Sequence, residues 1–139
     1  MNGAPEGNVK PSVLFVCRHN TGRSQMAEAY LRHFAGDAVE VASAGTIAAA
    51  ALDPGVVAVM AEDGIDISAA RPKRLTAERT EGVDRIVTMG CDVEGVPRID
   101  DDWGLPDPKG QPLEVVRGIR DAVKAKARAL GEELLASGR

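Results

Sequence analysis

The most constraining feature of this sequence is an apolar run that ends at a cysteine and is followed by a short polar loop and a helical pattern. The run SVLFVC (Ser12–Cys17) is typical of a strand buried on both faces of a parallel sheet. Beyond the loop, apolar residues recur at helical spacing until Gly36 supplies a stop. Strand, loop and helix in this order place the loop at the carboxyl end of the strand.

The same alternation continues along the chain. Val39–Gly45 and Asp84–Gly90 are predicted strands, and Asp53–Gly64 is a predicted helix with proline near its start. A long amphipathic helix is expected from Leu113 to about Ser137, with its apolar stripe made of Val115, Val116, Ile119, Val123, Ala127, Leu130 and Leu134. Strands alternating with helices predict an α/β fold, with an open, mostly parallel sheet, helices on both faces and ligands at the carboxyl ends of the strands.

Length and composition limit the function classes. A chain of 139 residues suits one domain, expected over residues 11–139 after a fraying tail at residues 1–10. The net charge of −4 argues against a nucleic-acid surface, and no apolar run approaches the roughly 18 residues of a membrane span. We expect a cytoplasmic monomer whose two cysteines, Cys17 and Cys91, are thiols. Two histidines without clustered cysteines make a zinc site improbable.

Residues 17–24, CRHNTGRS, have the spacing C-x5-R followed by serine at the start of a helix. Backbone N–H groups of such a loop bind a tetrahedral oxyanion, and Arg23 adds a planar fork for two of its oxygens. The same positive field favours the thiolate form of Cys17, which Ser24 can stabilise by a hydrogen bond. A buried, inert cysteine is the alternative, but the position between strand and helix favours a nucleophile. The predicted oxyanion-binding residues are Arg18, His19, Asn20, Thr21, Gly22, Arg23 and Ser24.

Two residues of this loop have open roles. His19 tunes the thiolate or contacts a partner, or it simply faces outward, and the sequence does not decide between these. Arg18 is expected to face solvent and to add local positive potential. Asn20 can hold the loop through side-chain bonds to the backbone, and Gly22 permits a close turn.

The chain resembles the low-molecular-weight tyrosine phosphatases and the arsenate reductases that share their fold. The motifs of this resemblance are VCRHNTGRSQMAEAYLR, SAG (Ser43–Gly45), GIDIS (Gly64–Ser68), IVTMGC (Ile86–Cys91) and LPDPKG (Leu105–Gly110). Ser-Gln-Met-Ala after the loop resembles the reductase branch, whereas the phosphatase branch usually has Ser-Pro. The resemblance implies a three-layer fold with a four-stranded parallel sheet, and reduction of arsenate to arsenite for arsenic detoxification. The alternatives are a phosphatase acting through a cysteinyl-phosphate and a catalytically silent anion-binding module.

A leaving oxygen needs a proton, and the resemblance implies that Asp107, between two prolines, is the general acid. The alternative is a plain Pro-Asp-Pro turn. Asp100, Asp101 and Asp102 are expected to be solvated surface. Trp103 is either a lid over the site or a packing residue.

Reduction of arsenate takes two electrons and therefore two thiols. The resemblance to the thioredoxin-coupled branch implies three cysteines, but this chain has only Cys91 after the last predicted strand, displaced by one position. We expect the ends of the strands that hold Cys17 and Cys91 to lie two positions apart, about 9–10 Å, which exceeds the roughly 7 Å limit for a disulfide. An external reductant, namely thioredoxin, a glutaredoxin-like redoxin, mycothiol or bacillithiol, is therefore favoured over Cys91, with no tightly bound cofactor.

The resemblance to some arsenate reductases also implies a potassium ion, held by residues matching Asn20, Glu28, Ser43 and Asp66. The basic cluster RPKR (Arg71–Arg74) is either a solvated loop or a source of positive potential that steers anions toward the site.

Overall fold

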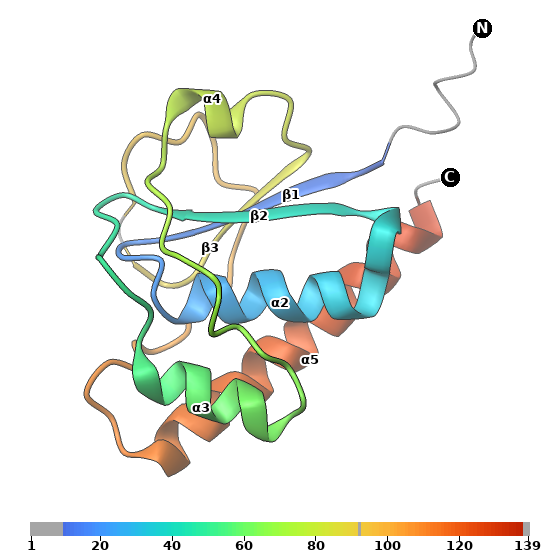
Figure 1. The fold of residues 1–139 in the computed structure, drawn as a ribbon. Coiled ribbons are helices and arrows are strands. Elements are labelled where there is room, and N and C mark those ends of the chain that lie inside the picture. The colour runs from blue at the N-terminus through green and yellow to red at the C-terminus, as the bar shows by residue number, and fades with distance from the viewer. Residues whose placement is uncertain (1–9, 92, 138–139) are drawn as a thin grey trace, which may run out of the picture.

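A computed structural model describes residues 10–91 and 93–137, so nearly all of the expected N-terminal tail lies outside the described residues. Its sheet has four parallel strands, β1 (Ser12–Cys17), β2 (Glu40–Gly45), β3 (Arg85–Thr88) and β4 (Asp101–Asp102) (Figure 1). Their order across the sheet is β2-β1-β3-β4. The predicted four-stranded parallel α/β sheet is confirmed, and β1 lies at its centre.

Three helices cover one face of the sheet: α2 (Arg23–Ala35), α3 (Pro54–Glu62) and α5 (Leu113–Ser137). Val13 and Phe15 of β1 pack against these helices. The other face buries Leu14 and Val16 under two loops and the one-turn helix α4 (Ala77–Thr80). Alternate residues of β1 are therefore buried in opposite layers, which explains its continuous apolar sequence.

Local signals fix the helix ends. Gly36 has φ of 58° and ends α2 before a short 3-10 helix, η1 (Gly36–Ala38). Asp53 accepts a hydrogen bond from the N–H of Gly55, and Pro54 begins α3. The expected stripe of α5 is wrong at one residue, because Val115 points toward solvent and is 39% exposed, one step away from the buried Val116.

Strand β4 has no apolar signature, and its acidic residues do more than the solvated surface expected for Asp100–Asp102. All three side chains are exposed. Asp100, just before β4, accepts a hydrogen bond from the N–H of Ile86. Asp102 Oδ1 accepts hydrogen bonds from Thr88 Oγ1 and from the N–H of Gly90. The N–H of Ile86, together with Arg98, holds the pKa of Asp100 below its usual range. Carboxylates thus attach the edge strand to β3 in place of apolar side chains.

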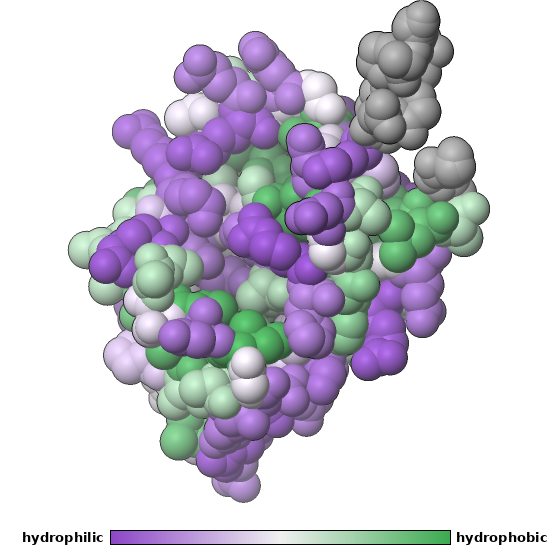
Figure 2. Space-filling view, turned by 45° about the vertical axis from the view of Figure 1, so that its right-hand side comes forward, coloured by the Kyte–Doolittle hydropathy of each residue, from purple (hydrophilic) through white to green (hydrophobic). Residues whose placement is uncertain are grey.

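Trp103 is a packing residue and not a lid. Its side chain is buried, and its ring lies 5.2 Å from the ring of Phe15, centroid to centroid. Its indole N–H donates to Asp101. Hydrophilic side chains cover most of the face seen in Figure 2, with apolar residues in smaller patches between them. Among the described residues, every helix is too short or too polar to cross a bilayer.

We predict that Asp102→Ala lowers the free energy of unfolding by about 1–2 kcal/mol, because Thr88 Oγ1 and the N–H of Gly90 lose a shared acceptor. Urea unfolding followed by circular dichroism measures this change. Asp121→Ala is the matched control, since its bond to Arg120 is a surface ion pair worth about 0–1 kcal/mol. Equal effects of the two substitutions would contradict the assigned role of Asp102.

Candidate active site

The loop between β1 and α2, residues 17–24 (the oxyanion loop), is held by the segment that follows β2. The carbonyl oxygens of Cys17, Arg18 and His19 accept hydrogen bonds from the N–H groups of Thr46, Ile47 and Ala49, at 3.1, 2.7 and 3.2 Å. The carbonyl oxygen of Thr21 accepts a hydrogen bond from the N–H of Asp53 at 3.1 Å. In a planar trans peptide the N–H points away from the C=O. Turning these carbonyls outward therefore turns the next N–H groups toward the centre of the loop, where an oxyanion can bind.

Gly45, the last residue of β2, makes this contact close enough. A Cβ at this position would lie 2.7 Å from the carbonyl oxygen of Arg18 and 2.8 Å from the nitrogen of Asn20. Any larger residue would push the strand away from the oxyanion loop. The SAG motif therefore has a steric reason to end in glycine.

Cys17 lies at the bottom of the loop, and only 4% of its surface is exposed. Its sulfur is 2.8 Å from Ser24 Oγ and 3.2 Å from the N–H of Asn20. Asn20 Nδ2 donates to Ser24 Oγ at 2.7 Å, so the hydroxyl hydrogen of Ser24 is free to point at the sulfur. Two donors, the hydroxyl of Ser24 and the N–H of Asn20, therefore converge on the sulfur of Cys17.

Arg23 is buried, with 8% of its surface exposed. Its Nη1 donates to the carbonyls of Met89, at 3.1 Å, and Leu105, at 2.7 Å. Met89 directly follows β3, and Leu105 directly precedes the Pro-Asp-Pro segment. Arg23 thus joins the oxyanion loop to both neighbouring segments, and its remaining N–H groups are available to an anion.

Asp107 lies in the same cavity as Arg23. Its side chain is exposed, and Oδ1 accepts the N–H of Lys109 at 3.0 Å, which makes a tight turn. The next residue, Pro108, is buried against Gly22, where a Cβ would lie only 2.9 Å from Pro108 Cγ. This contact docks the turn onto the oxyanion loop. The cavity has a volume of about 560 Å³ and is lined by Arg18, His19, Arg23, Gly90, Cys91, Leu105, Pro106 and Asp107.

The expectation that the strands ending near Cys17 and Cys91 lie two positions apart is wrong. Strands β1 and β3 are direct neighbours, with Val16 paired to Thr88, so the chain positions of Cys17 and Met89 lie side by side. Adjacent strands are about 4.8 Å apart, half the spacing expected from the sequence. Cys91 follows two residues later and lines the cavity above the loop.

Cys91 is half-buried, and its surroundings act on its acidity in opposite directions. Burial raises the pKa of the Cys91 thiol above its ordinary value. The Arg23 charge and a backbone hydrogen bond from Arg18 lower this pKa, and the proximity of Cys17 raises it. Because its pKa is raised, the Cys91 thiol is mostly protonated at neutral pH.

A family model described as low molecular weight phosphotyrosine protein phosphatase matches residues 12–96. A glutaredoxin arsenate reductase of Synechocystis sp. is 36% identical to this chain, over 85% of the chain and 94% of that protein. The chain belongs to the low molecular weight phosphotyrosine protein phosphatase family.

Solved structures of arsenate reductases have the same fold as this chain. A Corynebacterium glutamicum thioredoxin-dependent arsenate reductase superposes with a TM-score of 0.79 and 37% identity, covering 95% of this chain and 67% of that one. An arsenate reductase in a phosphate-binding state superposes with a TM-score of 0.78 and 34% identity, covering 89% and 98%.

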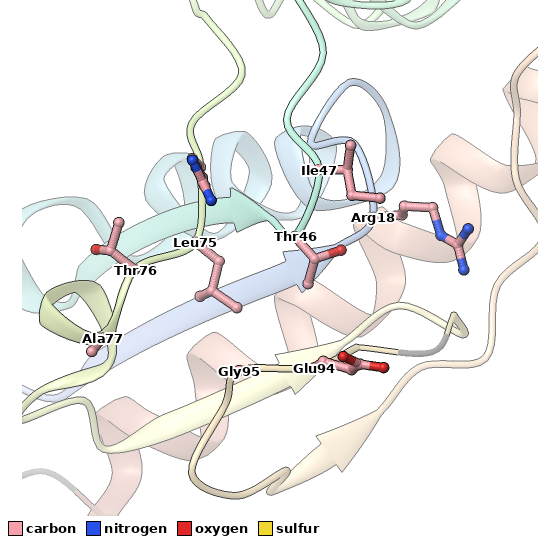
Figure 3. Close-up of a pocket in the computed structure, with 9 residues that line it drawn as sticks. Arg18, Thr46, Ile47, Leu75, Thr76, Ala77, Glu94 and Gly95 are labelled. Atoms are coloured by element: carbon pink, nitrogen blue, oxygen red, sulfur yellow. The ribbon is translucent and has the colours of Figure 1, made fainter.

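Within this family fold, the outer loop residues take different positions. Arg18 is exposed as expected, and His19 is half-buried with Nδ1 3.0 Å from the carbonyl oxygen of Ile47. Beside the site lies a larger cavity of about 740 Å³ that shares Arg18 with it. Figure 3 shows the side chain of Arg18 extending away from Leu75 and Thr76. The larger cavity contains none of the residues expected to react.

The residues expected to hold potassium do not form one set. Asn20, Ser43 and Glu28 are joined by hydrogen bonds, of 3.0 Å from Asn20 Nδ2 to Ser43 Oγ and 2.5 Å from Ser43 Oγ to Glu28. Asp66 is exposed and accepts the N–H of Ser68, and no bond joins it to the other three within the described chain. Both carboxylate oxygens of Glu28 already face cations, Lys73 on one side and Arg32 on the other. These residues do not fit a potassium ion.

Sequence reasoning missed two residues of this site. Lys73 lies in the basic cluster interpreted as a solvated or steering loop, yet its N–H donates to Asn20 Oδ1 at 2.8 Å. Gln25 Nε2 donates to the carbonyl and to Oδ1 of Asn20, at 3.2 and 3.0 Å, and to the carbonyl of Arg71. The available signal was Asn20 itself, because a buried amide in a loop needs partners for both its donors and its acceptor.

Proposed function

We propose that this protein is an arsenate reductase that converts arsenate to arsenite for arsenic detoxification, with Cys17 as the nucleophile. One observation supports this most strongly: Arg23, Cys91 and Asp107 line one cavity next to the buried Cys17. An anion site, an acid and two thiols are what a two-electron reduction of an oxyanion needs. Those relatives that are named arsenate reductases give independent support.

In the first step, the N–H groups of the oxyanion loop and Arg23 bind arsenate and neutralise its charge. The thiolate of Cys17 attacks arsenic, forming an S–As bond. One oxygen leaves as water, and Asp107 supplies the proton that this leaving group needs. Arsenic is still pentavalent at this stage.

In the second step, a thiolate attacks the sulfur of Cys17. An S–S bond forms, the S–As bond breaks, and its electron pair leaves with arsenic as arsenite. The two thiols are oxidised by two electrons in total. The pairing of β1 with β3 and the position of Cys91 in the cavity lining support Cys91 as this second thiol. Its proton passes to solvent.

An external reductant then restores the dithiol. A redoxin, either thioredoxin or a glutaredoxin-like protein, attacks the disulfide and takes it over. Mycothiol or bacillithiol would serve if a small thiol, and not Cys91, attacks Cys17. A thiol-driven cycle requires a reducing compartment, so the proposal includes a cytoplasmic location. It also takes the enzyme to be a monomer.

A phosphatase is the second candidate, because the family model is named for phosphotyrosine phosphatases. The first step would be the same, on phosphorus, and would end in hydrolysis of a cysteinyl-phosphate. The described lining of the cavity contains no Phe, Tyr or Trp to stack on an aryl ring. We therefore expect arsenate reduction to exceed aryl-phosphate hydrolysis.

A paired assay tests the proposed function. Purified protein is given arsenate or an aryl phosphate with each thiol donor in turn, and arsenite and phosphate are measured. We expect arsenite formation to dominate and Cys17→Ser to abolish it while phosphate still binds, because the loop N–H groups and Arg23 remain. Efficient dephosphorylation without arsenite would reverse the assignment.

Asp107→Asn is expected to slow the first chemical step by roughly 10²–10⁴-fold, the usual scale for loss of a positioned general acid. Rapid-quench measurement of the Cys17 adduct isolates this step from thiol exchange. Asp66→Asn, which removes an exposed carboxylate that does not line the cavity around Arg23, is the control. A rate unchanged in Asp107→Asn would leave Asp107 as a turn residue only.

Cys91 is tested by a single turnover without any external thiol. Wild-type protein should release about one arsenite per chain and gain an intramolecular disulfide seen by mass spectrometry, whereas Cys91→Ser should release none. Since the pKa of Cys91 is raised, the rate of release should increase by about tenfold per pH unit across neutral pH. Undiminished turnover of Cys91→Ser with a redoxin would instead favour the external-thiol route.

A further inference from the structure

We propose that the side chain of Lys73 is a built-in cation that holds the hydrogen-bond chain of Cys17 in its thiolate-stabilising orientation, so that no potassium ion is needed. The inference rests on Cys17 as the nucleophile of the proposed function. It assigns Lys73 and Glu28 as positioning residues, since neither lines the cavity around Arg23.

The charge of Glu28 is matched from two sides. Lys73 Nζ lies 3.4 Å from Glu28 Oε1, and Arg32 Nη2 lies 2.8 Å from Oε2. The Glu28 side chain is 12% exposed and that of Lys73 28%, so solvent screens this pair less than a surface pair. Lys73 Nζ also lies 3.5 Å from the carbonyl of Arg71. The univalent ammonium of Lys73 thus lies among oxygen acceptors, as a bound univalent metal ion would.

The hydrogen bonds between Glu28 and Cys17 run outward from the amide of Asn20, toward Glu28 on one side and toward Cys17 on the other. Ser43 Oγ donates to Glu28 Oε1 at 2.5 Å, which leaves its lone pairs to accept Asn20 Nδ2. The second hydrogen of that amide goes to Ser24 Oγ, whose own hydrogen then points at the sulfur of Cys17. Both ends of this chain are therefore acceptors, the carboxylate of Glu28 and the sulfur of Cys17.

The ammonium of Lys73 matters because Glu28 has to remain a carboxylate if these donors and acceptors are to keep their roles. A protonated Glu28 could donate a hydrogen bond to Ser43 Oγ. The hydroxyl hydrogen of Ser43 could then turn toward the amide nitrogen of Asn20 and disturb the hydrogen bond that this amide donates to Ser43. A cation beside a carboxylate favours its ionised form. The charge of Lys73 therefore acts on Cys17 through the orientation of Asn20 and Ser24, and also by cancelling a buried negative charge near the thiolate.

The backbone of Lys73 makes a separate contribution that a substitution leaves in place. Its N–H donates to Asn20 Oδ1, and its carbonyl accepts the N–H of Gly45 at 2.8 Å. A change of the side chain alone therefore tests the ammonium without releasing the loop that holds Asn20.

The test uses Cys91→Ser protein, so that Cys17 is the one thiol, and follows its alkylation by iodoacetamide against pH. Lys73→Ala should move the midpoint of this profile upward by about half to one pH unit, and Lys73→Arg should restore most of the shift. Lys126→Ala, which removes an exposed lysine of α5, is the matched control. Because alkylation needs no arsenate, this readout stands whether or not the reductase assay succeeds.

The same profiles are recorded in potassium chloride and in choline chloride of equal ionic strength. We expect wild-type protein to be indifferent to the salt, and Lys73→Ala to recover part of its shift in potassium, which can enter the space left by the ammonium. A potassium effect on wild type, or a Lys73→Ala profile equal to that of Lys126→Ala in both salts, would overturn the proposal. Thermal unfolding of each variant verifies that it is folded.

Discussion

The side chain of Asn20 is the contact on which the rest of the site depends. This residue is wholly buried and has φ of 58°, the one non-glycine residue with positive φ in the described chain. Such a conformation costs an asparagine less than other side chains, because its short amide bonds locally. Here the amide donates to Ser24 and Ser43 and accepts from Gln25 and from the backbone of Lys73. The strained turn is therefore stabilised from four directions, and its own N–H is aimed at Cys17.

The loop between β1 and α2 and the position of Cys17 in it could be predicted because their signals are local. An apolar run, a C-x5-R spacing and a helix start stand next to one another in the sequence, and the structure has the strand and helix where the pattern predicts them. Strand β4 could not be predicted in this way. It consists of Asp101 and Asp102, and hydrogen bonds to β3, not apolar burial, hold it in the sheet.

The distance between the two thiols depends on strand order, which no local pattern encodes. The two strands that end near Cys17 and Cys91 are separated in the sequence by another strand, three α-helices and a 3-10 helix, yet they are neighbours in the sheet. Their adjacency follows from which apolar faces pack together across the whole domain. The role of Lys73 is non-local for the same reason, since 45 residues separate it from Glu28.

The displaced position of the second thiol has a steric cause at Gly90. This residue has φ of 98°, and a Cβ there would lie 2.7 Å from the nitrogen of Leu105 and 2.9 Å from Gly104. A cysteine at position 90 would separate β3 from the segment that leads to Asp107. The thiol at position 91 avoids this clash and still lines the cavity.

Arg23 makes the positions of the acid and the second thiol depend on each other. Its Nη1 bonds the carbonyls of Met89 and Leu105, each two residues before a proposed reactive group, Cys91 or Asp107. An anion that draws the guanidinium toward the oxyanion loop therefore pulls on both segments at once. Since the same guanidinium lowers the pKa of Cys91, a shift of Arg23 toward the anion also changes how readily the second thiol ionises. In the proposed mechanism, binding of the oxyanion, delivery of the proton and approach of the second thiol are therefore coupled through one buried side chain.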